Sequence, residues 1–119
     1  MYQRILKAAK KNERHVTKFL RDLIAIKSLS SQEKPVIYRV KEEMEKCGFD
    51  KITIDKMGNI IGRIGKGKRV IAYDAHVDTV DVGNPTNWKV DPFKGAVKDG
   101  IMYGRGTCDM KGALASIVH

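Results

Sequence analysis

The hydrophobic positions of residues 16–24 recur with the period of an α-helix. The apolar side chains follow the spacing i, i+3, i+4, i+7, i+8, and they are Val16, Phe19, Leu20, Leu23 and Ile24. Residues at this spacing lie on one face of a helix, while the charged residues between them point elsewhere. The pattern predicts a helix that packs against a core and ends near Ile26.

A second helix is predicted after a polar break at residues 27–31. Ser30 followed by Glu33 has the pattern of a capping box, and Pro35 is tolerated in the first turn of a helix. Gly48 stands where the left-handed residue after a helix is expected. The apolar residues between these signals continue at helical spacing, and they are Val36, Val40, Met44 and Cys47. Cys47 is therefore expected to be a small core residue.

After the second helix the hydrophobic period changes from helical to alternating. Residues 52–64 are predicted to form a hairpin, and residues 97–103 a second one. Residues 69–75 are a short, mostly apolar run that predicts a buried strand leading into His76. Residues 113–118 indicate the start of another helix. This mixture of helices and strands predicts an α/β fold.

Composition narrows the class of protein. Of the 119 residues, 42% are apolar and 31% are charged, which permits a core and argues against global disorder. The sequence contains no run of about 20 apolar residues and no signal-peptide pattern, so no membrane span is expected. Two cysteines, Cys47 and Cys108, can build neither a disulfide framework nor a four-thiolate zinc site. A cytoplasmic protein with reduced thiols is expected.

Positive charge is concentrated in the first part of the chain. The net charge is +9, and residues 1–69 hold 18 basic and 8 acidic side chains, while residues 70–119 hold 5 and 6. A basic nucleic-acid-binding module is therefore one alternative. The basic residues are spread along amphipathic helices without interleaved aromatic residues or a recognition motif, which favours a solvated surface. We expect no nucleic-acid partner and no membrane partner.

A histidine and an aspartate follow the predicted strand at residues 69–75. Ligand sites in open α/β sheets gather at the carboxyl ends of strands, where His76 is expected to lie. Residues i and i+2 of an extended chain point the same way, so the Asp78 carboxylate can accept a ring N–H of His76 and orient the imidazole for metal binding. Spacing alone favours the structural interpretation, with Asp78 as a cap and His76 as a hydrogen-bonded histidine.

A glycine-rich segment, residues 104–112, precedes the last predicted helix. Glycines at three of its positions permit conformations and close approaches that other residues do not. Asp109 can be the N-cap of the following helix, as can Thr107, and taken alone this role is favoured. The alternative is that both oxygens of Asp109 are exposed and bridge two divalent ions.

Together these segments resemble the zinc-dependent amidohydrolase and metallopeptidase family that includes acetylornithine deacetylase, succinyl-diaminopimelate desuccinylase, carboxypeptidase G and aminoacylase. Three stretches in this order carry the resemblance, residues 75–80 (AHVDTV), 88–93 (WKVDPF) and 104–112 (GRGTCDMKG). Residues 41–50 and 57–59 are similar to a branch described as selenium-metabolism hydrolases. The resemblance covers nearly the whole chain.

This resemblance implies a fold and a metal site. The fold is a three-layer αβα catalytic domain with a mixed sheet, of which residues 1–119 would be the N-terminal part, without the family's lid and dimerisation domain. His76 would ligate one zinc ion, Asp109 would bridge two, and Asp78 would be the catalytic residue that orients His76. Cobalt is an alternative metal, because imidazole and carboxylate suit both ions.

The implied reaction is hydrolysis of an amide bond by metal-activated water. The substrate class is a small N-acyl amino acid or peptide-like molecule, and family members are often homodimers. The family's general base and its remaining metal ligands lie further along the chain than residue 119. Because zinc takes three or four protein ligands and His76 and Asp109 supply two, we expect the 119-residue chain to be a non-catalytic fragment by itself. His119 is expected to be frayed.

Overall fold

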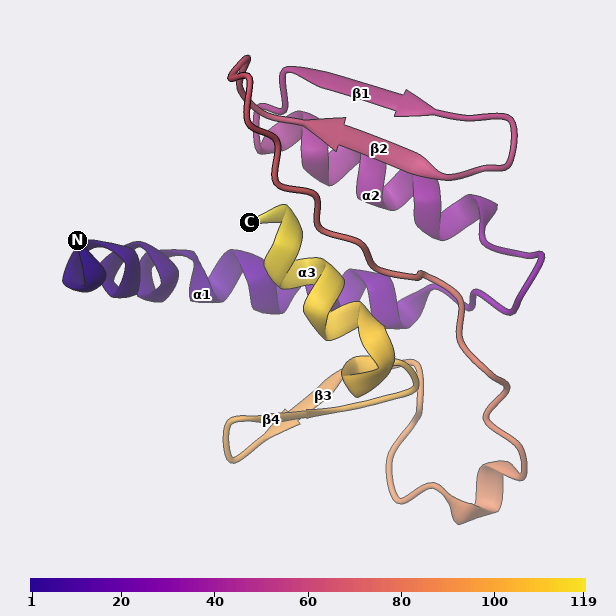
Figure 1. Ribbon diagram of the computed structural model, residues 1–119. Helices are drawn as coiled ribbons and strands as arrows, with labels where there is room; N and C mark the ends of the chain where they lie inside the picture. Colours follow the sequence, from indigo (N-terminus) through magenta and orange to yellow (C-terminus); the bar gives the residue numbers. More distant parts are fainter.

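Three helices form where the hydrophobic pattern predicts them. The computed structural model describes all residues, 1–119. Helix α1 spans Tyr2–Ala25, α2 spans Lys34–Lys46 and α3 spans Gly112–Val118. Both α2 and α3 pack against α1, and α3 crosses it (Figure 1). None of these helices is both long enough and apolar enough to cross a membrane.

The hydrophobic core lies where the three helices meet. Every helix contributes, and the buried residues of the main cluster are Phe19, Leu23, Val36, Val40, Met44, Leu114, Ala115 and Val118. Complete burial of one large apolar side chain stabilises a fold by about 1.5–3 kcal/mol, so this cluster is the main source of stability. The first half of α1 lies outside the core, and its Tyr2 and Ile5 side chains are exposed.

The C-terminal end of α2 has the predicted glycine but not the predicted burial of Cys47. Gly48 has a φ of +75°, its N–H donates to the Glu45 carbonyl (3.1 Å), and the Phe49 N–H donates to the Met44 carbonyl (3.1 Å). This pair of bonds is the Schellman motif, which satisfies free carbonyls at a helix end. Cys47 is exposed, because it is the C-cap residue at the edge of the core.

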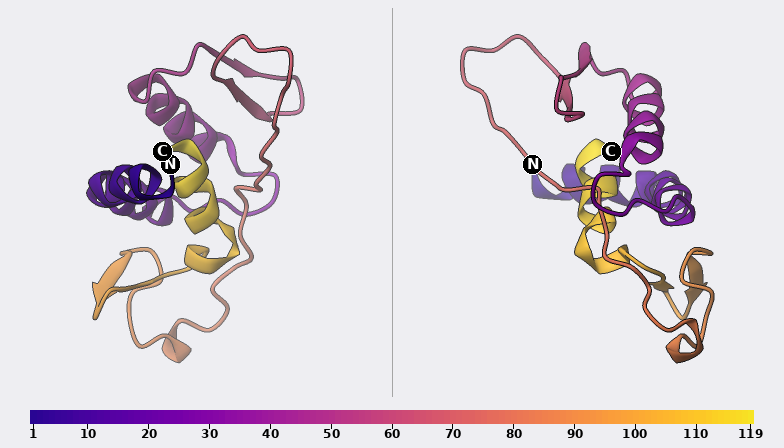
Figure 2. Two further views of the ribbon diagram at one scale, coloured as in Figure 1. Left: turned by 60° about the vertical axis from the view of Figure 1, so that its left-hand side comes forward. Right: turned by 90° about the vertical axis from the view of Figure 1, so that its right-hand side faces the viewer.

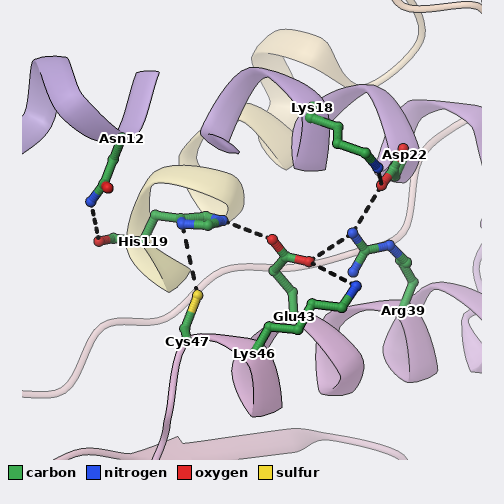
Figure 3. A network of polar contacts seen from close by, with 8 residues as sticks. All are labelled: Asn12, Lys18, Asp22, Arg39, Glu43, Lys46, Cys47 and His119. Atoms are coloured by element: carbon green, nitrogen blue, oxygen red, sulfur yellow. Dashed lines mark hydrogen bonds and ion pairs between the residues drawn. The ribbon is translucent and has the colours of Figure 1, made fainter. Parts of the chain in front are cut away.

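A polar network borders the core near residue 119. The expectation that His119 is frayed is wrong, because its side chain is part of this network. Its Nε2 lies 2.9 Å from Oε1 of Glu43 (Figure 3). Its ring also packs edge-on against Phe19. Arg39 bonds both Glu43 (2.7 Å) and Asp22 (2.9 Å). Burial raises the pKa of the Glu43 carboxyl, but hydrogen bonds from Arg39 and His119 outweigh burial and hold that pKa below its ordinary value.

The strands form two separate antiparallel hairpins, as predicted. Strand β1 (Lys51–Ile54) pairs with β2 (Ile60–Arg63), and β3 (Ala96–Lys98) pairs with β4 (Ile101–Tyr103). The β1–β2 hairpin lies beside α2, whereas the β3–β4 hairpin lies on the other side of α1 (Figure 1). The mixture of helices and strands agrees with the predicted α/β class.

The strand predicted at residues 69–75 is not formed. This stretch is extended but pairs with no other strand, and it runs from the β1–β2 hairpin past α3 (Figure 2). Val70, Ile71 and Tyr73 are 73%, 80% and 75% exposed. A buried strand needs hydrogen-bonding neighbours, and residues 69–75 pair with the free edge of neither two-stranded hairpin. The mixed sheet is therefore not assembled within these residues.

Lys111 ties the turn before α3 to the end of α1. Its side chain is buried, and Nζ donates to the carbonyls of Leu23 and Ile26, at 2.8 Å each. Carbonyls at the end of a helix lack the regular helical donor, and here the ammonium group supplies one to Ile26 and a second one to Leu23, which also accepts from the Ile26 N–H. Burial lowers the pKa of Lys111 to about 8.

We predict that Lys111→Met destabilises the chain. Methionine fills a similar volume but removes the donor of the Ile26 carbonyl and one of the two donors of the Leu23 carbonyl, at a cost of about 1–3 kcal/mol. Urea unfolding followed by circular dichroism measures the change. Lys94→Met is the matched control, because Lys94 is exposed and its removal should leave the midpoint unchanged. Equal midpoints for Lys111→Met and the parent chain would contradict the anchoring role.

Candidate metal centre

His76 and Asp109 lie in contact although they are 33 residues apart. Nε2 of His76 is 2.9 Å from Oδ1 of Asp109. The other ring nitrogen, Nδ1, lies 3.0 Å from the backbone oxygen of Asp78 and 3.2 Å from its carboxylate Oδ1. The fold thus brings the three site residues expected from sequence into one cluster.

The segment that carries His76 is held by the loop between α1 and α2. Ser28 is buried, its hydroxyl donates to the Val77 carbonyl (2.8 Å), and its own carbonyl accepts from the Thr79 N–H (2.8 Å). These two bonds fasten residues 77–79 directly beyond the end of α1. Because His76 precedes this fastened stretch, its backbone position is set by α1.

Ser30 bonds Asp78 and does not cap α2 as the sequence pattern predicted. Its hydroxyl donates to Oδ2 of Asp78 at 2.6 Å, while the N-cap of α2 is Glu33, which makes no side-chain cap bond. Ser31, with a φ of 69°, turns the chain between Ser30 and the helix, and its N–H donates to the Glu33 carboxylate. The turn directs Ser30 toward residue 78.

The conformation of Asp109 excludes the N-cap role that its sequence position favoured. Its backbone is extended (φ −123°, ψ 98°), and the residue preceding α3 is Lys111, with no side-chain cap bond. Thr107, the other predicted cap, donates its hydroxyl to the Gly104 carbonyl at 3.0 Å. The side chain of Asp109 is 86% exposed, and its Oδ1 faces His76.

Gly106 allows the two halves of the site to approach each other. It has a φ of +84°, and a Cβ at this position would lie 2.7 Å from Cγ2 of Thr79. Only glycine tolerates both the left-handed backbone and this contact. The glycine-rich stretch therefore packs directly on the segment that carries His76 and Asp78.

Hydrogen bonds make this cluster favourable for positive charge. The bond to Asp109 raises the pKa of His76 above its ordinary value and outweighs the smaller opposing effect of burial. The bond from Ser30 lowers the pKa of the Asp78 carboxyl. Both shifts favour the charged forms, a protonated imidazole at His76 and an ionised carboxylate at Asp78.

The donor set fits a divalent metal ion. Ligand atoms around a tetrahedral zinc ion are about 3.3 Å apart for nitrogen and oxygen, and the observed separation of Nε2 and Oδ1 is 2.9 Å. With Nδ1 of His76 facing Asp78, a deprotonated Nε2 would direct its lone pair to the side of Asp109, where an ion could replace the proton that the two residues share. His76 and Asp78 also line a groove of about 1120 Å³ that runs between the β1–β2 hairpin, α2 and α3.

Sequence reasoning missed three residues that position this cluster. Ser28 and Ser30 lie in the segment 27–31, which the sequence indicated only as a polar break between two helices. Lys111 stands two residues after Asp109, and the hydrophobic pattern assigns it no role. All three act through bonds to residues 48 or more positions away. No local periodicity signals such bonds, and the only hint was the presence of two hydroxyl groups directly after a predicted helix.

Comparison with known proteins places these residues in a family context. Residues 72–119 match the model of peptidase family M20/M25/M40. Over 118 residues the chain is 52% identical to a protein of Escherichia coli described as uncharacterized protein YgeY. This alignment covers 99% of the chain and 29% of the Escherichia coli protein. It is 33% identical over 110 residues to probable succinyl-diaminopimelate desuccinylases of Staphylococcus aureus and Staphylococcus epidermidis, covering 90% of this chain and 28% and 27% of theirs. The chain thus spans less than a third of the length of these relatives.

We predict that Gly106→Ala destabilises the chain more than Gly100→Ala does. Both positions have positive φ, for which a Cβ costs about 1–2 kcal/mol. Only at Gly106 does the added methyl group also collide with Thr79, whereas nothing lies within 4 Å at Gly100. Thermal unfolding of both variants measures the difference, and Thr79→Ser should recover part of the loss at residue 106. Equal losses at the two glycines would show that the contact with Thr79 carries no cost.

We predict that Asp109→Asn lowers the pKa of His76. The carboxylate stabilises the protonated imidazole, so its replacement by a neutral amide removes the largest cause of the raised pKa. NMR titration of the His76 ring in the presence of a chelator measures the effect. Asp99→Asn, in the exposed turn of the β3–β4 hairpin, is the matched control. A His76 titration unchanged by Asp109→Asn would mean that the contact does not persist in solution.

Proposed function

Because residues 72–119 match the model of peptidase family M20/M25/M40, we propose that the protein of which this chain is a part hydrolyses amide bonds with the help of bound divalent metal ions. The observation that carries the proposal is the contact of 2.9 Å between His76 and Asp109, which are the two residues expected to ligate metal. Zinc is the proposed ion and cobalt the alternative, since neutral imidazole and carboxylate suit both.

The proposed roles of the residues follow from their hydrogen bonds. His76 binds one ion through Nε2, and Asp109 bridges two ions with its exposed carboxylate. Asp78 holds Nδ1–H of His76 and thereby fixes the tautomer that leaves Nε2 free, and Ser30 holds Asp78. When bound, a metal ion in such a site lowers the pKa of its water to near neutrality and polarises the carbonyl of the substrate.

The proposed substrate class is a small N-acyl amino acid or a peptide-like amide. Two relatives at 33% identity carry the description of probable succinyl-diaminopimelate desuccinylase, an activity on an N-acyl group. The groove beside His76 is large enough for a ligand of this size. The general base and further metal ligands would come from parts of the protein outside residues 1–119.

The proposal includes the place of this chain in the larger protein. Residues 1–119 would be the N-terminal part of the catalytic domain, and a lid and dimerisation domain would complete a homodimeric, cytoplasmic enzyme. With two of the three or four ligands that zinc needs, the 119-residue chain alone would not turn over substrate. Hydrolysis by that isolated chain would contradict this part of the proposal.

We predict that His76→Ala and Asp109→Ala abolish hydrolysis in the full-length protein and lower its metal content. Asp78→Asn should retain more metal than these two variants do. Its metal affinity or activity should still fall about 10–100-fold, as is typical when the hydrogen-bond partner of a metal-binding histidine is replaced. Metal analysis and turnover of a panel of N-acyl amino acids measure both effects. His15→Ala is the matched control, because His15 is an exposed histidine on α1. Full activity of His76→Ala would contradict the proposal.

A further inference from the structure

A second cluster of metal-ligating side chains lies at the opposite end of α2 from Ser30. Glu43 and Cys47 are four residues apart on one face of α2, and His119 follows α3 (Figure 3). One ligand atom from each of the three lies within 4.8 Å of the others. The cluster shares no residue with the site of His76 and Asp109.

The separations in this cluster approach those of ligands around one ion. Sγ of Cys47 lies 3.7 Å from Nδ1 of His119, and Oε1 of Glu43 lies 2.9 Å from Nε2 on the opposite side of the ring, so one ion can take only one of these two nitrogens. With one ligand atom counted from each residue, all three lie within 4.8 Å of one another. Ligand atoms around a tetrahedral zinc ion are about 3.3–3.7 Å apart. Because Cys47 is exposed, its side chain can rotate to shorten the longest of these separations.

The carboxylate of Glu43 is already oriented. Its Oε2 is held by Arg39 at 2.7 Å and by Lys46 at 3.7 Å, which leaves Oε1 directed at His119. The Glu43 and His119 side chains are each only 10% exposed, and the ring of His119 packs against Phe19. Carboxylates and imidazoles held by such outer partners are the usual ligands of protein metal sites.

Charged side chains surround the cluster. Facing Glu43 are Arg39 and Lys46, and Asp22 and Lys18 complete the network (Figure 3). Burial and the nearby Glu43 raise the pKa of the Cys47 thiol. A free thiol of this kind is a poor nucleophile, so a role in covalent catalysis is not favoured. A divalent ion would supply the charge that ionises it.

We propose that Glu43, Cys47 and His119 form a separate mononuclear site for a divalent ion of the zinc class, which joins the end of α2 to the end of α3. Carboxylate, thiolate and imidazole together are a ligand set of zinc, and a fourth position remains for water. Because α2 and α3 both contribute to the core, an ion at this site would stabilise the contact between them.

Cobalt substitution tests the proposal, because a thiolate bound to Co²⁺ gives a charge-transfer absorption band in the near ultraviolet. The 119-residue chain, reduced and treated with a chelator that is then removed, is titrated with Co²⁺. We expect the band to appear and to saturate near one equivalent, and we expect Zn²⁺ to abolish it by displacing Co²⁺. Cys47→Ser should lose the band, and His119→Asn should weaken Co²⁺ binding at least tenfold.

Two controls separate this site from others. Cys108→Ser should keep the band, because Cys108 is the other exposed cysteine and lies beside Asp109. His76→Ala should also keep it, so that failure of the proposed hydrolytic site leaves this result unaffected. Circular dichroism confirms that each variant is folded. As a second measurement, Zn²⁺ should raise the thermal midpoint of the parent chain but not that of Cys47→Ser.

Two results would overturn the proposal. One is the absence of both the band and a zinc-dependent rise in the thermal midpoint of the parent chain. The other is a band that survives Cys47→Ser and is lost in Cys108→Ser, which would place the thiolate ligand next to Asp109.

Discussion

The free carbonyl groups at the C-terminal end of α1 are the constraint on which the rest of the structure depends. A helix leaves its last carbonyls short of partners, and here the buried ammonium group of Lys111 donates to the carbonyl of the C-cap residue Ile26 and adds a second bond to that of Leu23, which also accepts from the Ile26 N–H. The carbonyl of Ser28, directly after the helix, accepts from Thr79. One short stretch of chain therefore fastens both the turn that carries Asp109 and the segment that carries His76.

This arrangement explains how residues from an unpaired, exposed segment are placed precisely. The segment from residue 69 to 75 has no strand partner, yet beyond it the chain is held by Ser28 and Ser30 and pressed against Gly106. Rigid positioning begins at the residues that we propose as metal ligands. Sites held by outer hydrogen bonds keep their donor atoms oriented even where the backbone nearby lacks regular structure.

The two clusters of ligating side chains differ in their surroundings. His76 and Asp109 are open to solvent, with exposed fractions of 48% and 86%, which suits a site that must admit a substrate. Glu43 and His119 are each 10% exposed and stand within a network of ion pairs between helices. Their position beside the core suits a structural role, in which a bound ion would strengthen helix packing and take no part in a reaction.

The helices and hairpins whose sequence signals are local could be predicted from the amino-acid sequence. The stripe from Val16 to Ile24, the glycine after α2 and both hairpins follow from periodicity and turn chemistry, and the resemblance to a known family singled out His76, Asp78 and Asp109. Three other features became known only from the three-dimensional structure. Ser30 bonds Asp78, the side chain of Lys111 is buried, and Cys47 lies beside His119. The tertiary structure also left residues 69–75 unpaired, because a strand depends on partners that these residues do not specify. Periodicity records how each residue relates to its neighbours along the chain, whereas these contacts join residues 48 or more positions apart and depend on the path of the whole backbone.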